Sequence, residues 1–495
     1  MKEIKELILI TQKHTFSEAN IVNNLQSDEL EHILLQKIIQ NEVKNDQEAC
    51  KEIYKEEKIN SSYRTLKHRL KERLHNQLLF IESDKLQEDR LKKAQYECSR
   101  LYTQAHGLYV TRYRQLAKKR YKKCLALAKA YEFTHMASIC VNELINIALL
   151  ERNTKEYKYY ETETEQLQKT IQEEIRVRNL AARFLLMIVG SVAERNEALQ
   201  QAPELILKLK ASWKDTLSNN IFLYYYKVQL AYWEYTNNFE KILTVTIDAN
   251  LLIKRGKINE LLFSREYNNY MYILSLYKVE KYTECVERVS TYLKALKVGA
   301  PNYFLFEEIL ILAYIHLEAY KKAAERIIFC QQQTTFQKAS PQTQKLFDVY
   351  LTYASYMADE LDLKYFTQVS QYFNKFLLKR KIINLAIYNL EILICLEERD
   401  FSLLKANIDT LYKFYVRYFR TGQNQRLKIW MKLIRLILRN DFNYEVIIAK
   451  AKASYEELKK MPVRTDEAWE AEIVPYQLLW KKALEKIYTH TEKSL

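Results

Sequence analysis

The stretch Leu312–Glu325, LAYIHLEAYKKAAE, decides the fold that this sequence predicts. Its first half has apolar residues at helical spacing, and a short polar turn follows. The aromatic residue Tyr320 comes next, and the small residue Ala323 lies three positions later. We expect Tyr320 to fill the corner between two helices and Ala323 to let them approach closely. A single hairpin of this kind cannot bury both of its faces, so it must stack on neighbouring hairpins.

The same pattern recurs from residue 239 onward, with aromatic residues spaced 43, 38, 46, 35 and 41 positions apart. The copies, of which the last is looser, are Asn238-Phe239 with Ile242, Lys281-Tyr282 with Cys285, Ala319-Tyr320 with Ala323, Tyr365-Phe366 with Val369, Asp400-Phe401 with Leu404, and Asp441-Phe442 with Glu445 and Val446. Asn238, Asp400 and Asp441 are expected to cap the second helix of their copies by accepting backbone N–H bonds. The series predicts an elongated, right-handed α-solenoid.

Glycine and proline are both scarce, with five of each in 495 residues. Sheets need glycine for tight turns, and nucleotide-binding folds need clustered glycines where the backbone meets phosphate. The scarcity therefore predicts an all-α chain without a phosphate-binding loop. The content of 48% hydrophobic and 28% charged residues is that of a globular protein, and the length requires several domains or a stack of repeats. The net charge of +15 favours acidic partners.

Leu312–Glu325 resembles the tetratricopeptide repeats, through Leu-Ala-Tyr in its first helix and Tyr-x-x-Ala at the start of its second. Tyr272–Tyr282 is a weaker copy. The family's helix-packing glycine and closing proline are absent, and the period is longer and less regular than the usual ~34 residues. The resemblance covers residues 220–460, and it implies a scaffold that binds proteins or peptides in a groove rather than an enzyme. We expect an N-terminal helical unit at 1–83, degenerate hairpins at 84–219 and the repeat solenoid at 220–495.

The sequence of the N-terminal unit predicts three short helices, of which the third is basic. Helices are expected from Ser27-Asp28, over Asp46–Tyr54, and from Tyr63 to Ile81 after the capping residues 60–62. The last of these has an apolar face and an opposite basic face. This arrangement loosely resembles a helix-turn-helix domain with Tyr63–Leu74 as the groove-reading helix. Two interpretations stay open, a solvated basic face or a DNA-contacting one, and the candidate DNA-contacting residues are Arg64, Lys67 and Arg69.

Two clusters of basic residues are the positive functional signal. Between Thr410 and Asn440 there is no acidic residue, and the bases are Lys413, Arg417, Arg420, Arg426, Lys428, Lys432, Arg435 and Arg439. The last four follow helical spacing on a helix that is otherwise apolar, which predicts one exposed basic ridge. A second cluster includes Arg112, Arg114, Lys118 and Lys119. Either cluster could be a solvated face, a ridge that orients an acidic protein segment, or, with the aromatic residues at 412–419, a surface for nucleic acid.

No residue pattern points to catalysis, a metal or a cofactor. The chain has no GxxxxGK[ST], GxGxxG, GxSxG, HExxH or EF-hand sequence, and the acidic pair Glu307-Glu308 is expected on a solvated helix face. The seven cysteines show no CxxC spacing, which is typical of buried thiols in a reducing compartment. No segment has the ~18 apolar residues of a membrane span or a signal peptide's apolar run, so a cytoplasmic location is expected. The predicted function is a non-enzymatic scaffold for a protein or peptide partner; the alternative is a regulator or nucleic-acid-binding protein that uses its basic helices.

Overall fold

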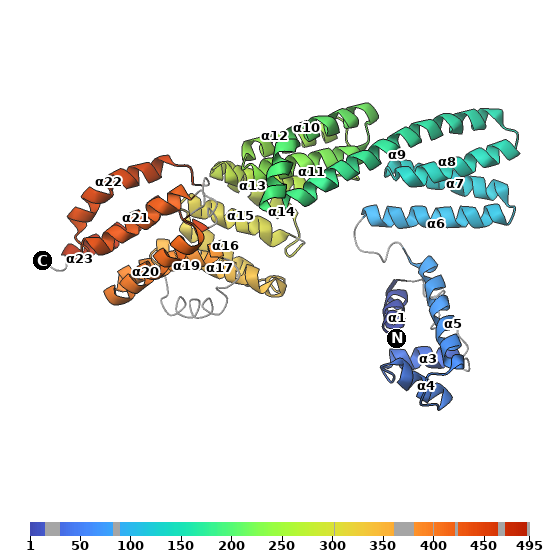
Figure 1. The fold of residues 1–495 in the computed structure, drawn as a ribbon, viewed down its shortest axis with the longest axis horizontal. Coiled ribbons are helices and arrows are strands. Elements are labelled where there is room, and N and C mark those ends of the chain that lie inside the picture. The colour runs from blue at the N-terminus through green and yellow to red at the C-terminus, as the bar shows by residue number, and fades with distance from the viewer. Residues whose placement is uncertain are drawn as a thin grey trace. The chain divides into compact units, whose positions relative to one another are not determined.

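The computed structural model describes residues 1–14, 30–82, 90–300, 302–360, 381–398, 400–420, 424–463 and 471–492. Across these ranges the regular structure is helical, with no β-strand, which confirms the predicted all-α class (Figure 1). The chain divides into two compact units, one of residues 1–235 with 248–265 and one of residues 236–247 with 266–495. The domain boundaries expected at 84 and 220 stay predictions.

In the first unit, helices that follow one another in the chain also pack against one another from α6 through α11. Its helices are α1 (Lys2–His14), α3 (Leu30–Ile39), α4 (Asp46–Tyr54), α5 (Ser61–Gln77), α6 (Arg90–Val110), α7 (Arg114–Ala130), α8 (Thr134–Leu150), α9 (Thr154–Ile188), α10 (Val192–Thr216) and α11 (Asn219–Tyr235). This neighbour-on-neighbour packing is what a series of helical hairpins requires.

The second unit repeats this sequential packing, in the runs α14–α17 and α19–α23. Its helices are α13 (Arg265–Lys278), α14 (Tyr282–Ala295), α15 (Tyr303–His316), α16 (Tyr320–Gln331), α17 (Pro341–Met357), α19 (Lys381–Glu398), α20 (Phe401–Tyr418), α21 (Gln425–Arg439), α22 (Tyr444–Lys460) and α23 (Tyr476–Glu492). Helix α12 (Phe239–Lys254) is divided between the units after residue 247.

The aromatic signature marks the starts of helices, as predicted. Phe239, Tyr282, Tyr320 and Phe401 are the first residues of α12, α14, α16 and α20. The residue three positions later is fully buried in each of these copies: Ile242, Cys285, Ala323 and Leu404. The predicted caps Asn238 and Asp400 accept hydrogen bonds from the N–H groups of Lys241 and Leu403. The copy at Phe366 lies outside the described residues.

The register predicted for the last copy is wrong by two residues. Asp441 and Phe442 both have positive φ and belong to the turn. Helix α22 begins at Tyr444, and its cap is Asn443, whose side chain accepts from the N–H of Val446. The buried residue three positions after the aromatic is then Ile447, so the copy keeps the pattern in the corrected register.

Many hairpin turns share one backbone geometry, and they achieve it without glycine. A left-handed residue lies two positions before the next helix starts; these residues are Arg112, Glu132, Arg152, Asn237, Glu280 and Glu318. The following N–H then bonds back to the carbonyl five residues earlier, as from Phe133 to Ala128 at 2.8 Å. This bond is the C-terminal closure usually built around glycine. The chain therefore makes tight, uniform hairpins despite its glycine scarcity.

The N-terminal helices α1 and α3–α5 enclose a hydrophobic cluster of their own. Leu34, Leu35, Leu70 and Leu74 are fully buried there. Helix α5 was expected to reach Ile81, but it ends at residue 77 and a short 3-10 helix, 78–80, follows. The helix start predicted at Ser27-Asp28 lies outside the described residues.

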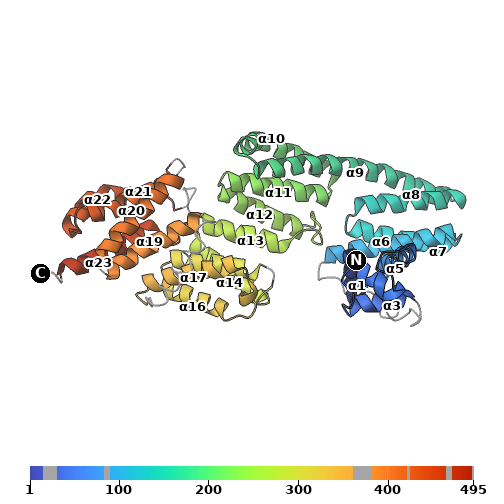
Figure 2. The same cartoon turned by 60° about the horizontal axis from the view of Figure 1, so that its bottom comes forward.

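The core of the C-terminal helices is centred on Trp430 of α21. Its indole stacks on the ring of Tyr476 in α23, with centroids 5.1 Å apart and planes 5° from parallel. Its N–H donates to the side-chain oxygen of Asn389 in α19 at 2.8 Å. Helix α23 packs against both α19 and α21, and all three lie at the C-terminal end of the unit (Figure 2). One face of α21 is thus fixed firmly inside the unit.

Candidate functional site

Helix α21 carries the predicted basic ridge on its outer face. Lys428, Lys432 and Arg439 are exposed and Arg435 is partly exposed, while most of the intervening apolar residues are buried and Leu436 and Leu438 are half-buried. Among the described residues, none of these four side chains forms an ion pair with a carboxylate. We call Lys428, Lys432, Arg435 and Arg439 the α21 stripe. What the α21 stripe binds stays a prediction.

Two arginines of this region lie on tyrosine rings. The guanidinium carbon of Arg435 is 3.9 Å from the ring centre of Tyr412 in α20, and that of Arg417 is 5.1 Å from the ring centre of Tyr418. Stacking of this kind restricts the guanidinium plane while its N–H edges remain able to donate. The α21 stripe is therefore flanked by α20 and partly ordered before any partner binds.

The aromatic residues upstream of the stripe belong mainly to the core. Tyr415 and Phe419 are buried, and Tyr412, Phe414 and Tyr418 pack against the core from its edge. The face of Tyr412 is covered by Arg435. These rings are engaged in packing, which leaves little aromatic surface for stacking on nucleic-acid bases.

By sequence, Arg426 groups with the other bases between residues 410 and 440, but its side chain is not part of the basic surface. It is fully buried, and its guanidinium forms an ion pair with Glu472 at 2.5 Å. It also donates to the backbone oxygens of Leu458 and Met461 and to the side chain of Gln477. Arg426 ties the start of α21 to the end of α22 and the segment before α23, a structural role that the local sequence did not reveal.

The second basic cluster, on α7 and the turn before it, is divided between exposed and paired side chains. Arg112, Arg114 and Lys119 are exposed. Lys118 is partly buried and forms ion pairs of 2.5 Å with both Glu151 and Glu156. Burial lowers the pKa of Lys118, but hydrogen bonds to the two carboxylates outweigh it and raise the pKa overall. Lys118 therefore links α7 to the α8–α9 turn instead of facing outward.

The candidate DNA-contacting residues of α5 are divided in the same way. Arg64 and Arg69 are exposed. Lys67 donates to the carboxylate of Asp46 at 2.8 Å, which fixes α5 to the start of α4. A polar depression of about 590 Å³ beside α5 is lined by side chains that include Arg69, Arg73 and Glu31. DNA binding by α5 stays a prediction.

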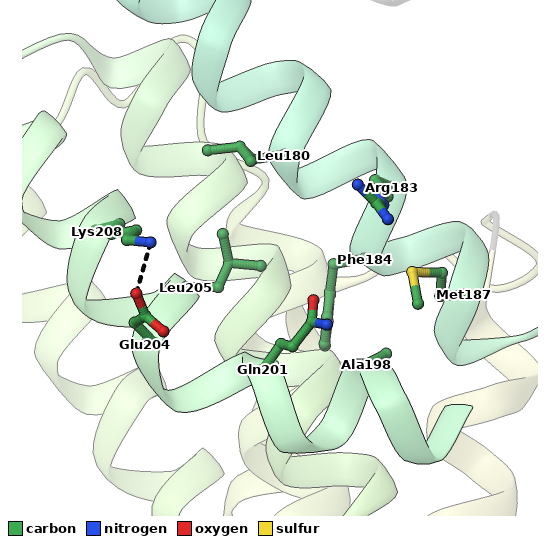
Figure 3. Close-up of a pocket in the computed structure, with 9 residues that line it drawn as sticks. All are labelled: Leu180, Arg183, Phe184, Met187, Ala198, Gln201, Glu204, Leu205 and Lys208. Carbon is green, nitrogen blue, oxygen red and sulfur yellow. Dashed lines mark ion pairs between the residues drawn. The ribbon is translucent and has the colours of Figure 1, made fainter. Parts of the chain in front are cut away.

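A smaller cavity of about 190 Å³ lies between α9 and α10 (Figure 3). Leu180, Phe184 and Leu205 supply apolar lining, and Lys208 pairs with Glu204 at 2.6 Å across one side. The lining residues include no histidine, cysteine or serine. The cavity can accept an apolar side chain, but it does not place a nucleophile beside a base.

The acidic pair Glu307-Glu308 is not on a solvated face, contrary to the sequence prediction. Glu307 is fully buried and forms a bidentate pair with Arg326. Glu308 accepts a hydrogen bond from the hydroxyl of Tyr350 at 2.8 Å. Both carboxylates join neighbouring helices, so their role is structural.

A buried polar cluster in the first unit was not predicted at all. Glu132 accepts from the backbone N–H and side-chain amide of Asn219, and burial raises the pKa of its carboxyl. Glu174 accepts from Thr134, Ser218 and Asn220. The cluster connects the α7–α8 turn, α9 and the start of α11. No signal in the sequence brings together residues that are so far apart in the chain.

In the ranges that the structure covers, no group of three or more His, Cys, Asp or Glu side chains is arranged to hold a metal ion. None of the helices described there is at once long enough and apolar enough to cross a lipid bilayer. All seven cysteines are buried free thiols, as expected from their spacing. The chain matches no protein-family model, no curated protein sequence and no solved structure.

Proposed function

We propose that this chain is a non-enzymatic scaffold that binds an acidic segment of a protein partner along the α21 stripe. In this proposal its hairpins form a right-handed solenoid of the tetratricopeptide-like kind, and α20 and α21 present the binding surface. Sequential helix packing and the aromatic residues at the helix starts support this architecture.

The observation that carries the proposal is the α21 stripe itself. Elsewhere in the fold, basic side chains pair with carboxylates of neighbouring elements, as Lys118 does with Glu151 and Arg326 with Glu307. The four cations of the stripe have no such carboxylate among the described residues, although they share one helix face. Concentrated, uncompensated charge of one sign attracts a complementary partner and increases its association rate.

The spacing of the stripe also limits what can match it. From Lys428 to Arg439 the helix rises by about 16 Å at 1.5 Å per residue. A partner helix with acidic residues at positions i, i+4, i+7 and i+11 presents carboxylates at the same intervals. Because the opposite face of α21 is anchored through Trp430, the cations are held by a rigid element. Such preorganisation lowers the entropy cost of binding.

We favour an acidic protein segment over single-stranded nucleic acid as the partner of the α21 stripe. Single-strand binding combines phosphate contacts with bases stacked on open aromatic faces. Tyr415 and Phe419 are buried, and the ring of Tyr412 is covered by Arg435. The basic residues therefore lack exposed aromatic platforms beside them.

A synthetic peptide tests the proposal directly. The probe is an alanine-rich helix with glutamates at i, i+4, i+7 and i+11, and its control has glutamines there. We expect the full chain to bind the glutamate peptide in fluorescence anisotropy, more weakly as salt increases. The variant K428E/K432E/R439E should lose at least roughly tenfold in affinity, since each exposed charge pair contributes up to about 1 kcal/mol.

The matched control reverses three exposed lysines elsewhere in the same unit, K294E/K297E/K322E, and so changes the net charge equally. Equal losses in both variants would mean that only overall charge matters, and the α21 stripe would not be the site. The alternative regulator function has its own assay: duplex DNA retained by the chain and released by R64E/R69E would favour it instead.

A further inference from the structure

Two hairpin turns of the first unit come together at one end of its helices. The α6–α7 turn and the α8–α9 turn project at the same end in Figure 1. The side-chain amide of Gln115 donates to Glu151 at 2.8 Å, which joins the two turns directly. Lys118 also contacts Glu151, at 2.5 Å. Residues 110–116 and 149–155 therefore form one continuous surface, which we call the hairpin tip.

The hairpin tip exposes large apolar side chains. Val110, Tyr113, Leu116, Leu149 and Leu150 have 66%, 63%, 50%, 63% and 51% of their surface exposed. Single exposed apolar residues are ordinary in globular proteins, but a group gathered on one surface marks an interaction site. These five come from two turns that the fold places side by side, so they form such a group.

On the hairpin tip, basic side chains are exposed and acidic side chains are paired within the fold. Arg112, Arg114, Arg152 and Lys155 are all exposed. The acidic residues of the α8–α9 turn and the first turn of α9, Glu151 and Glu156, pair with Lys118, and Glu156 also pairs with Lys122. Both carboxylates are thus paired within the fold, and the exposed charged residues of the hairpin tip are all cations.

We propose that the hairpin tip docks reversibly on an anionic lipid surface. Its apolar side chains would enter the headgroup and acyl boundary while the arginines and Lys155 contact lipid phosphates and carboxylates. This inference goes beyond the proposed function, because it uses another unit and another kind of partner.

Other occupants fit the hairpin tip less well. A second copy of the tip would bring like charges together, which opposes association. Nucleic acid offers phosphates for the arginines but nothing that requires five exposed apolar side chains. The cavities described above lie beside α5 and between α9 and α10, and neither is lined by residues of the hairpin tip. The hairpin tip projects and belongs to neither of these cavities, so it fits the flat surface of a bilayer better than a peptide that needs a groove.

Co-flotation of the full chain with vesicles tests the proposal. The probes are phosphatidylcholine vesicles with and without phosphatidylserine. We expect binding only to the vesicles that contain phosphatidylserine, with a steep loss at high salt. The variant R112Q/R114Q/R152Q should lose roughly a hundredfold in partitioning, at about fivefold for each base. The variant L149S/L150S keeps every charge and should lose at least about tenfold.

The control variant K294Q/K297Q/K322Q removes three exposed charges outside both proposed binding surfaces and should bind these vesicles like the wild type. R112K/R114K/R152K keeps the charge and should retain binding within a few-fold. Far-UV circular dichroism of each variant confirms that the helices are intact. The proposal is overturned if the wild type does not float with phosphatidylserine vesicles, if L149S/L150S binds normally, or if the control loses as much as the tip variants. None of these outcomes depends on the acidic peptide, so the two proposals fail separately.

Discussion

Replacement of Arg426 by methionine should destabilise the C-terminal helices strongly. Among the described residues, the guanidinium forms five hydrogen bonds, two to the Glu472 carboxylate and three to Leu458, Met461 and Gln477. Arg426 and Glu472 are both almost completely buried. Arg426→Met fills much of the space but removes the cationic partner of a buried carboxylate.

The expected cost is about 3–5 kcal/mol, the range for breaking one side of a buried ion pair. Urea unfolding followed by circular dichroism and tryptophan fluorescence measures it. With a slope of about 3 kcal/mol per M, the midpoint of the transition that reports α21 should fall by roughly 1 M or more. Trp430 lies in α21 one turn from Arg426, so its share of the emission of the five tryptophans reports the affected region.

The double variant Arg426→Met with Glu472→Leu separates the pair from the packing. When both charges of the pair are replaced by apolar groups, neither is left buried without its partner, and most of the lost stability should return. A loss of unfolding free energy below about 1 kcal/mol in Arg426→Met, or a double variant as unstable as the single one, would contradict this prediction.

Three further predictions concern other parts of the fold. Glu318 has left-handed backbone in its turn, so Glu318→Gly should stabilise the second unit by about 1 kcal/mol. Glu287 lies on the exposed face of α14, so Glu287→Gly should cost about as much. Changes in unfolding free energy of the same sign for both variants in urea melts would contradict this. Burial raises the pKa of Glu132, so the folded state holds that proton more tightly than the unfolded state does. Stability should therefore rise as pH falls toward the ordinary glutamate value, and Glu132→Gln should lack this gain in pH-dependent unfolding; an identical pH profile would be the contrary result. A hydrogen bond to Cys140 and burial raise the pKa of Cys124 to about 12, and burial raises that of Cys395 to about 11. Both thiols should react with Ellman's reagent only after unfolding, and rapid labelling of the native chain would show the packing to be wrong.

The features predicted correctly are those that depend on nearby residues. Tyr320 and Ala323 lie three positions apart, so their roles at a helix start follow from local geometry. The exposed α21 stripe follows from helical periodicity in the same way. The copy at residue 442 failed because Asn443 rather than Asp441 provides the cap, and both types of side chain can cap a helix.

The features that were missed depend on residues far apart in the chain. Arg426 finds its carboxylate 46 residues later, and Lys118 finds one of its partners 33 residues later. Composition alone cannot distinguish these cations from Lys428 or Lys432, which have no such partner among the described residues. The hairpin tip likewise exists only because the fold brings together two turns joined by Gln115 and Glu151.

The hairpin turns differ from most helix ends in the residue types that adopt left-handed backbone. Glycine is the usual residue where a helix ends in left-handed backbone. The chain instead places Arg152, Glu280 and Glu318 in that conformation. The closing hydrogen bonds form all the same, and packing of the flanking helices compensates for the local cost.

Affinity capture by the immobilised chain tests the central claim most directly. A nuclease-treated lysate of the native host is passed over the wild type, over K428E/K432E/R439E and over the control K294E/K297E/K322E, and the retained proteins are identified. We expect an acidic protein that the wild type and the control retain in stoichiometric amounts and that the stripe variant loses. Retention unchanged by reversal of the α21 stripe, or retention that disappears on nuclease treatment, would contradict this expectation.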